Sequence, residues 1–137
     1  MNLVAFTDGA SRNNPGEAGI GIVIKDENGN TLSRIHQYLG IATNNVAEYT
    51  ALIRCLETIL SPGRFDCSSL VVHTDSELMA RQIEGRYKIK DRHLKVLHAR
   101  ATELMASAGF PCTVTHIPRS QNSEADMLAN EAIDSKA

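Results

Sequence analysis

The apolar residues of this chain follow two periods, and the change from one to the other divides the sequence into elements. Residues 2–7 form a short apolar run that predicts a strand, ending in a turn at Asp8-Gly9. The following stretch, Gly9–Gly16, is rich in Gly, Asn and Pro and predicts a loop. Residues 19–24 and 31–39 predict two more strands, joined as a hairpin by a turn at residues 26–30.

From Val46 the apolar period becomes helical. The elements predicted after this point are a helix to about residue 60, a strand over 70–74, a helix over 76–83, a helix over about 94–108, a strand over 113–117 and a helix from about residue 125. The order β-β-β-α-β-α-α-β-α predicts an α/β fold. Its five-stranded mixed sheet has three antiparallel strands followed by parallel strands and is flanked by helices.

Length and composition indicate an ordinary folded protein. We predict a single domain over residues 1–137, because 42% of the residues are apolar, 22% are charged and no linker divides the chain. No apolar run is long enough to span a membrane, and the apolar start is too short for a signal peptide. The three cysteines form no paired motif, so we expect a reducing cytoplasm. We also expect the protein to be a monomer.

Four acidic residues occupy comparable places in the predicted fold. Asp8 and Asp75 end strands, while Glu48 and Asp126 begin helices. In open α/β sheets such positions meet at one edge, so the four carboxylates are expected to converge. Oxygen donors suit Mg²⁺ or Mn²⁺ rather than zinc, and a divalent ion would relieve their mutual repulsion. The net charge of −2 does not argue against nucleic acid, because setting four site carboxylates aside leaves +2.

Each acid also has a purely local interpretation. Asp8 with Gly9 is typical of a turn, Glu48 of a first-turn acid that stabilises the helix dipole, and Asp75 of a helix cap. Asp126 completes a possible capping box over residues 123–126. Spacing alone does not choose between these interpretations and a shared site.

The sequence segments that contain these acids are more specific than the spacing of the acids. They read TDGASRNNPG at residues 7–16, TNNVAE at 43–48, TDS at 74–76 and NSEADMLA at 122–129. In this order they resemble the four motifs of ribonuclease HI, and the resemblance covers residues 2 to about 134. It implies the ribonuclease H fold and a metal-dependent endonuclease that hydrolyses the RNA strand of RNA/DNA hybrids. The products would carry 5′-phosphate and 3′-hydroxyl ends.

The resemblance also implies roles for individual residues. Asp8, Glu48, Asp75 and Asp126 would bind two Mg²⁺ ions, with Mn²⁺ able to substitute. One ion would activate a water and the other would stabilise the leaving 3′ oxygen.

Substrate contacts follow from the same resemblance. The positions that match contacts to the DNA strand are Thr43, Asn44 and Asn45, and those that match contacts to the RNA strand are Asn13 and Asn14. Turn chemistry at Asn13 and Asn14, or helix capping at Asn44 and Asn45, are alternatives.

Three departures from the family pattern affect these expectations. Residues 85–91 run straight on where many bacterial members carry a basic, Trp-containing protrusion, which implies a compact form resembling archaeal members. Glu77 stands where a Gln is frequent. The segment before Asp126 is short, and it places Arg119 where longer loops carry a catalytic His; we predict a phosphate-organising role for Arg119 and a structural one for His116.

Two other functions stay open at this point. One is a nuclease of the same fold that also acts on duplex RNA or on RNA–DNA junctions. The other is a nucleic-acid-binding module that has lost catalysis, although such modules usually lack one or more of the acids, and all four are present here.

Overall fold

The computed structural model describes all residues from Met1 to Ala137. Its elements are β1 (Asn2–Ser11), β2 (Gly16–Lys25), β3 (Thr31–Ala42), α1 (Asn44–Leu60), β4 (Ser69–Thr74), α2 (Glu77–Ile83), α3 (Arg92–Ser107), β5 (Cys112–His116), a 3₁₀ turn η1 (Arg119–Gln121) and α4 (Ser123–Ser135). The predicted order of strands and helices is confirmed, with the 3₁₀ turn added. No helix combines the length and apolar character needed to cross a membrane.

The sheet has the mixed topology that the element order predicts. Its strands lie in the order β3-β2-β1-β4-β5. The pairs β1–β2 and β2–β3 are antiparallel, whereas β1–β4 and β4–β5 are parallel. The fold class is therefore confirmed, and β1 is the central strand where the antiparallel and parallel halves meet.

The predicted end of the first strand is wrong. We expected a turn at Asp8-Gly9, but β1 continues to Ser11 because its ladder with β2 runs on from Asp8 opposite Gly21 to Ser11 opposite Ala18. The predicted loop over residues 9–16 shrinks accordingly to residues 12–15. Only the parallel ladder with β4 stops early, at Thr7 opposite Thr74.

Several other boundaries also shift by a few residues. The first helix begins at Asn44 rather than Val46, because the Thr43 side chain accepts a hydrogen bond from the Val46 N–H and caps it. Asn44 and Asn45 are thus helical, and the capping interpretation of these two residues is wrong. The hairpin strands β2 and β3 are longer than predicted, since cross-strand pairing continues to Gly16 opposite Ala42.

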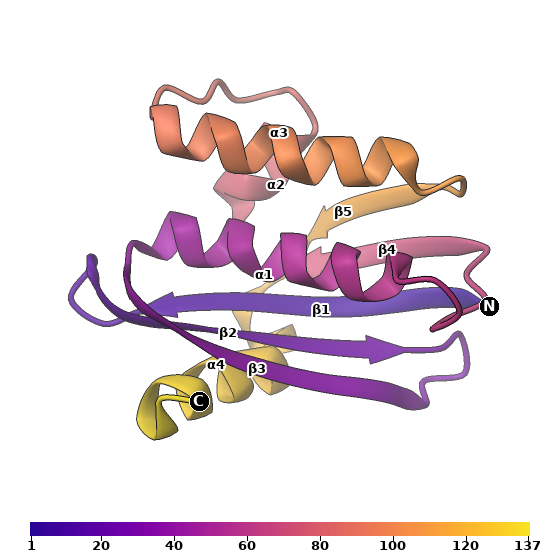
Figure 1. The fold of residues 1–137 in the computed structure, drawn as a ribbon, viewed down its shortest axis with the longest axis horizontal. Helices are drawn as coiled ribbons and strands as arrows, with labels where there is room; N and C mark the ends of the chain where they lie inside the picture. The colour runs from indigo at the N-terminus through magenta and orange to yellow at the C-terminus, as the bar shows by residue number, and fades with distance from the viewer.

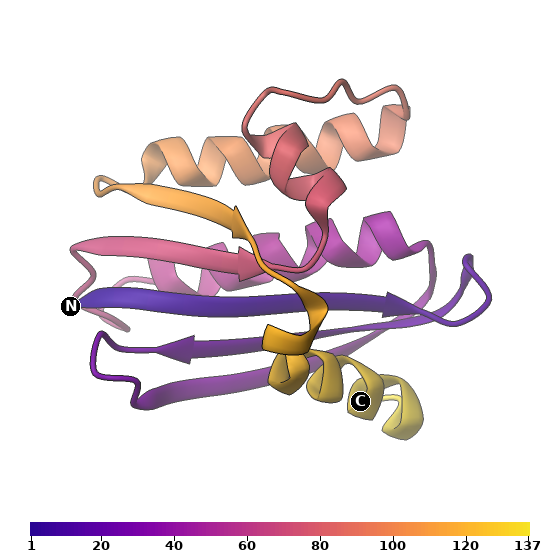
Figure 2. The same ribbon diagram turned by 180° about the vertical axis from the view of Figure 1, so that it is seen from behind.

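Helices cover the two faces of the sheet unequally. Figures 1 and 2 show α1, α2 and α3 on one side and α4 alone on the other. The main apolar core lies under α1, where Tyr49, Leu52 and Leu56 are almost fully buried. On the opposite face α4 approaches β2 so closely that a Cβ at Gly21 would overlap the Ala125 carbonyl oxygen. The chain from α2 to α3 is a short connection over residues 84–91 without a protrusion.

Candidate active site

A polar cavity lies at the edge of the sheet where the parallel ladder of β1 and β4 ends. Its volume is about 410 Å³, and none of the residues that line it is hydrophobic. The lining residues are Asp8, Gly9, Ser11, Asn44, Asn45, Glu48, Asp75, Ser76, Arg119 and Asp126. The cavity therefore brings together the four acids, Arg119 and two of the five predicted substrate residues.

Asp8 and Asp75 meet because they follow the last rung of one parallel ladder. Thr7 and Thr74 form that rung, and both are fully buried. The residue that follows each threonine is an aspartate, on β1 for Asp8 and just past the end of β4 for Asp75, at the carboxyl edge where the rule for open α/β sheets places a site. Asp75 does not cap α2, because the Ser76 side chain accepts the capping hydrogen bond from Met79 N–H.

Glu48 reaches the same place from α1. It is the fifth residue of this helix, so the first-turn interpretation is wrong, and its side chain is 8% exposed. Its Oε1 accepts a hydrogen bond of 2.8 Å from the Gly9 N–H. A side chain at residue 9 would overlap the backbone of Ala47 and Glu48, so the contact between β1 and α1 depends on glycine.

Asp8, Glu48 and Asp75 form a compact group of carboxylates. One oxygen from each lies within 4.8 Å of the other two. Burial and the charges of Glu48 and Asp75 raise the pKa of Asp8 well above its usual range. Burial, and then the charge of Asp75, raise the pKa of Glu48 to about 8. Burial and mutual repulsion thus disfavour the ionised forms of Asp8 and Glu48, and a bound cation would offset both effects.

Asp126 faces this group from the other side of the sheet. It lies in the first turn of α4, and its charge adds to the raised pKa of Asp8. The capping-box interpretation is wrong, because Asn122 occupies the N-cap position and no side chain caps this helix. Asp126 is not part of the compact group of three.

The donor chemistry fits a divalent metal. Every ionisable side chain that lines the cavity, except that of Arg119, is a carboxyl group, and no His or Cys lines it. Hard oxygen ligands of this kind suit Mg²⁺ or Mn²⁺ and do not suit structural zinc. The cluster therefore fits a divalent cation by its chemistry and its geometry.

The two candidates from the short segment before α4 lie in different places. Arg119 begins the 3₁₀ turn, and its side chain is 81% exposed, with Nη2 3.8 Å from Asp126 Oδ1. His116 ends β5 and does not line the cavity. Its Nδ1 lies 4.0 Å from a carboxylate oxygen of Glu77.

The predicted substrate residues are arranged around the mouth of the cavity. Asn44 and Asn45 line it, while Asn14, Thr43 and Asn45 line an adjoining hollow of about 430 Å³. Asn13 lines neither and has a positive φ of 66°. Side chains link these segments, since Asn14 Oδ1 accepts from the Asn44 N–H at 2.9 Å.

Sequence reasoning missed several residues at this site. Gly9 and Ser76 line the cavity because each directly follows an acid, and Ser11 lines it from the end of β1; the motif around Asp8 is the only sequence signal for Gly9 and Ser11. Asn122 was also missed. It is 1% exposed, and its Nδ2 donates to the Thr7 carbonyl at 2.9 Å, so it connects the start of α4 to β1.

Comparisons with known proteins agree on one family. A family model described as reverse transcriptase-like matches residues 6–132. Ribonuclease HI of Halobacterium salinarum is 42% identical over 95% of this chain and 63% of its own length. A bifunctional protein of Mycobacterium tuberculosis is 39% identical over the whole chain but only 37% of its own length. The chain thus spans less than two thirds of these relatives.

A solved structure of the same family matches this chain over nearly the full length of both chains. LC11-RNase H1, determined in complex with an RNA/DNA hybrid, is 45% identical, with a TM-score of 0.93 over 98% of this chain and 99% of that one. Together with the ordered motifs and the carboxylate cavity, these matches place the chain in the reverse transcriptase-like family and, within it, among the type 1 ribonucleases H, the ribonuclease HI family.

Proposed function

We propose that this protein is an endoribonuclease that hydrolyses the RNA strand of RNA/DNA hybrids and leaves 5′-phosphate and 3′-hydroxyl ends. The observation that carries the proposal is the convergence of Asp8, Glu48 and Asp75 within 4.8 Å in a cavity without apolar residues. The hybrid bound by LC11-RNase H1 supports the choice of substrate. A binding module without catalysis would not need buried carboxylates that destabilise one another.

The cation of this site is proposed to be Mg²⁺, two ions per site, with Mn²⁺ as a substitute. Asp8, Glu48 and Asp75 would hold the ions from one side and Asp126 from the other. When bound, the ions lower the pKa of an attacking water and neutralise charge on the phosphate and the leaving oxygen. The protein's own task is to keep four carboxylates close together before the substrate arrives.

That task is divided between the backbone and the side chains. The β1–β4 ladder fixes Asp8 and Asp75, and the Gly9 N–H fixes one oxygen of Glu48. The remaining oxygens face the cavity, where desolvation strengthens their attraction for a cation.

Arg119 is proposed to organise a phosphate oxygen or a water of the substrate complex. Its side chain is largely exposed and is held only by the 3.8 Å contact to Asp126, so it is free to turn toward a ligand. A guanidinium stays charged throughout the neutral range and therefore acts by position rather than by proton transfer.

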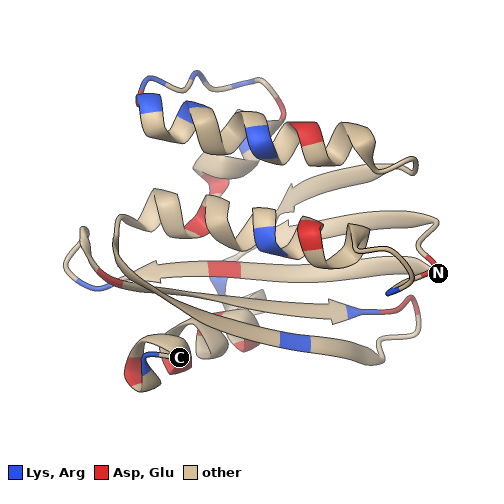
Figure 3. Cartoon of the chain, in the orientation of Figure 1, with Lys and Arg blue, Asp and Glu red and all other residues tan.

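The hybrid is proposed to lie across the cavity mouth. Asn13 and Asn14 would contact the RNA strand, where the 2′-hydroxyl distinguishes it from DNA. Thr43, Asn44 and Asn45 would contact the DNA strand. Basic residues also gather along the α2–α3 connection and the start of α3, where Arg86, Lys88, Lys90, Arg92 and Lys95 are all exposed (Figure 3). They supply positive charge where other members carry the protrusion.

Cleavage of end-labelled duplexes tests the proposal. The purified chain should cut the RNA strand of an RNA/DNA hybrid when Mg²⁺ or Mn²⁺ is present, and should leave duplex DNA intact. Duplex RNA and a chimeric RNA–DNA strand, run in parallel, test the wider nuclease activity. Hybrid binding without cleavage in either metal would contradict the proposal and favour the binding module.

We also propose that the protein is a monomer located in the cytoplasm. All three cysteines are free thiols, in keeping with a reducing cytoplasm. The cytoplasmic location and the monomeric state remain predictions, which fractionation and light scattering would test.

A further inference from the structure

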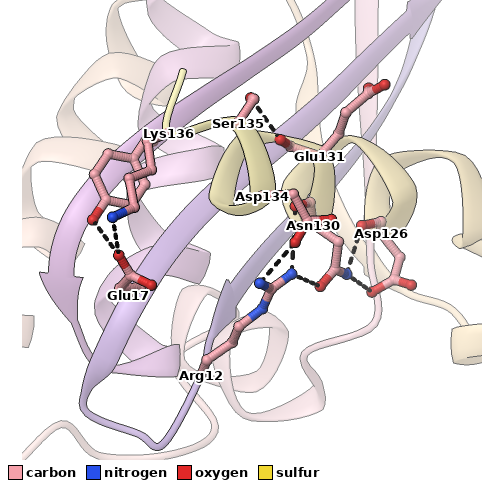
Figure 4. A network of polar contacts seen from close by, with 9 residues as sticks. Arg12, Glu17, Asp126, Asn130, Glu131, Asp134, Ser135 and Lys136 are labelled. Atoms are coloured by element: carbon pink, nitrogen blue, oxygen red, sulfur yellow. Dashed lines mark hydrogen bonds and ion pairs between the residues drawn. The ribbon is translucent and has the colours of Figure 1, made fainter.

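A chain of polar contacts joins the turn between β1 and β2 to Asp126 (Figure 4). Arg12 Nη2 lies 3.2 Å from Asn130 Oδ1. The amide nitrogen of Asn130 lies 3.0 Å from the main-chain oxygen of Asp126 and 3.4 Å from its Oδ1. Asn130 follows Asp126 by one helical turn on α4, so both side chains share one face of the helix.

Arg12 determines which way the Asn130 amide points. A guanidinium carries only donors, so the group that it contacts must be the amide oxygen. The amide NH₂ is then directed at Asp126, as a donor to a carboxylate. Without Arg12 the amide is free to rotate and present its oxygen to the negative carboxylate, which is repulsive.

Two further contacts hold Arg12 in place, one through its guanidinium and one through its backbone. Its Nη1 forms an ion pair of 2.8 Å with Asp134 Oδ1, and the Arg12 N–H donates to the Glu17 carbonyl at 2.9 Å. Because the side chains of Arg12 and Asp134 are 44% and 68% exposed, this ion pair contributes little to stability. Stability alone therefore does not account for the chain of contacts.

We propose that Arg12 and Asn130 are positioning residues for the fourth carboxylate. They hold Asp126 turned into the cavity through its Oδ1, which is also the oxygen nearest Arg119. Neither contact uses Oδ2, which is left for the cation. This inference rests on the proposed function, since it concerns how a metal ligand is oriented.

Calorimetric titration with Mn²⁺ alone tests the proposal without relying on activity. Asn130→Ala and Arg12→Met should each weaken Mn²⁺ binding by about 10-fold, the lower end of the effect of removing a group that orients a metal ligand. On the labelled hybrid they should lower kcat with little change in KM. Arg12→Lys keeps a donor for Asn130 Oδ1 and should recover part of both losses.

Two control variants distinguish an effect on the orientation of Asp126 from a general weakening of the attachment of α4. Asp134→Asn removes the charge of the ion pair but keeps an amide oxygen that can accept from Arg12 Nη1, so Arg12 stays in place and the Mn²⁺ affinity should stay as in the wild type. Glu17→Gln weakens the 3.2 Å ion pair between Glu17 and Lys136, which also attaches the end of α4 to β2. Its Mn²⁺ affinity should likewise equal that of the wild type. Equal losses in these controls and in Asn130→Ala would overturn the proposal.

A double-mutant cycle identifies the residue through which Asn130 acts. If it acts through Asp126, Asp126→Asn with Asn130→Ala should lose no more Mn²⁺ affinity than Asp126→Asn alone. Additive losses would overturn the proposal, as would a raised KM with unchanged kcat in Arg12→Met, which indicates direct phosphate binding. Failure of the proposed function is distinguishable, because the wild-type chain would then bind no Mn²⁺ or cut no hybrid.

Discussion

The two halves of the acidic site are built in different ways. Asp8 lies on β1, Asp75 directly follows β4, and Glu48 lies on α1 with its Oε1 bonded to the Gly9 N–H; Asp8 and Glu48 are buried. Asp126 and Arg119 stand at the start of α4 and in the 3₁₀ turn before it, and only side chains orient them. We infer that the first half supplies a cation site fixed by the backbone, whereas in the second half Asp126 is held by side chains and Arg119 adjusts to the substrate.

The largest effect is expected when a charge is removed from the fixed half. Asp8→Asn, Asp75→Asn and Glu48→Gln each delete one negative charge at nearly constant volume. Cleavage of the hybrid should fall by at least about 10²–10³-fold, the effect of losing one preorganised electrostatic group, while the fold persists by circular dichroism. Asp126→Asn should cost less. Near-wild-type cleavage by Asp8→Asn would remove the basis for the assignment.

Gly9 tests whether the fixed half depends on the contact between β1 and α1. A methyl group at residue 9 has no space against Ala47, so Gly9→Ala must push α1 away from β1. Overpacking of this kind costs about 1–3 kcal/mol of unfolding free energy, and the Glu48 hydrogen bond should be lost with it. Both the Tm and the affinity for Mn²⁺ should therefore be lower than in the wild type. Gly29→Ala is a control with open space around it, although its φ of 83° adds local strain.

The same half should make stability depend on pH when metal is absent. Glu48 has a pKa of about 8 in the folded protein and about 4.3 when unfolded, so the folded state binds the proton more tightly. Its stabilising contribution is complete below pH 4 and is lost as the pH rises through 8. In EDTA, the wild-type Tm should fall between pH 5 and pH 8 more steeply than that of Glu48→Gln.

Divalent ions should reverse this loss. A ligand that binds only the folded state stabilises it by RT ln(1 + [L]/Kd), and the carboxylates bind the ion in their deprotonated form. Millimolar Mg²⁺ or Mn²⁺ should thus raise the Tm at pH 8 more than at pH 5. A shift no larger than that of an ionic-strength control would mean that the acids do not share an ion.

The same division separates what the sequence predicts from what it does not. The element order and the places of Asp8 and Asp75 follow from apolar periodicity and from the rule for strand ends. Asp8-Gly9 was misjudged as a turn, because the local signal is typical of one and the pairing with Gly21 that extends β1 is a long-range contact. The contact of Arg12 with Asn130 joins residues 118 positions apart, and no local pattern indicates it.

Arg119 gives the smallest expected effect and addresses the adjustable half directly. Its exposed side chain makes one loose contact, so Arg119→Ala should lower turnover several-fold, roughly 1 kcal/mol of transition-state stabilisation, without changing the Tm. Arg119→Lys should recover only part of this loss, because an ammonium cannot contact phosphate with two parallel donors. No step in the pH–rate profile near neutrality should depend on this residue. His116→Ala is the paired control and should alter the Tm more than the turnover. If His116→Ala stops cleavage in a stable protein while Arg119→Ala is silent, then the end of β5, rather than the 3₁₀ turn, supplies the assisting group.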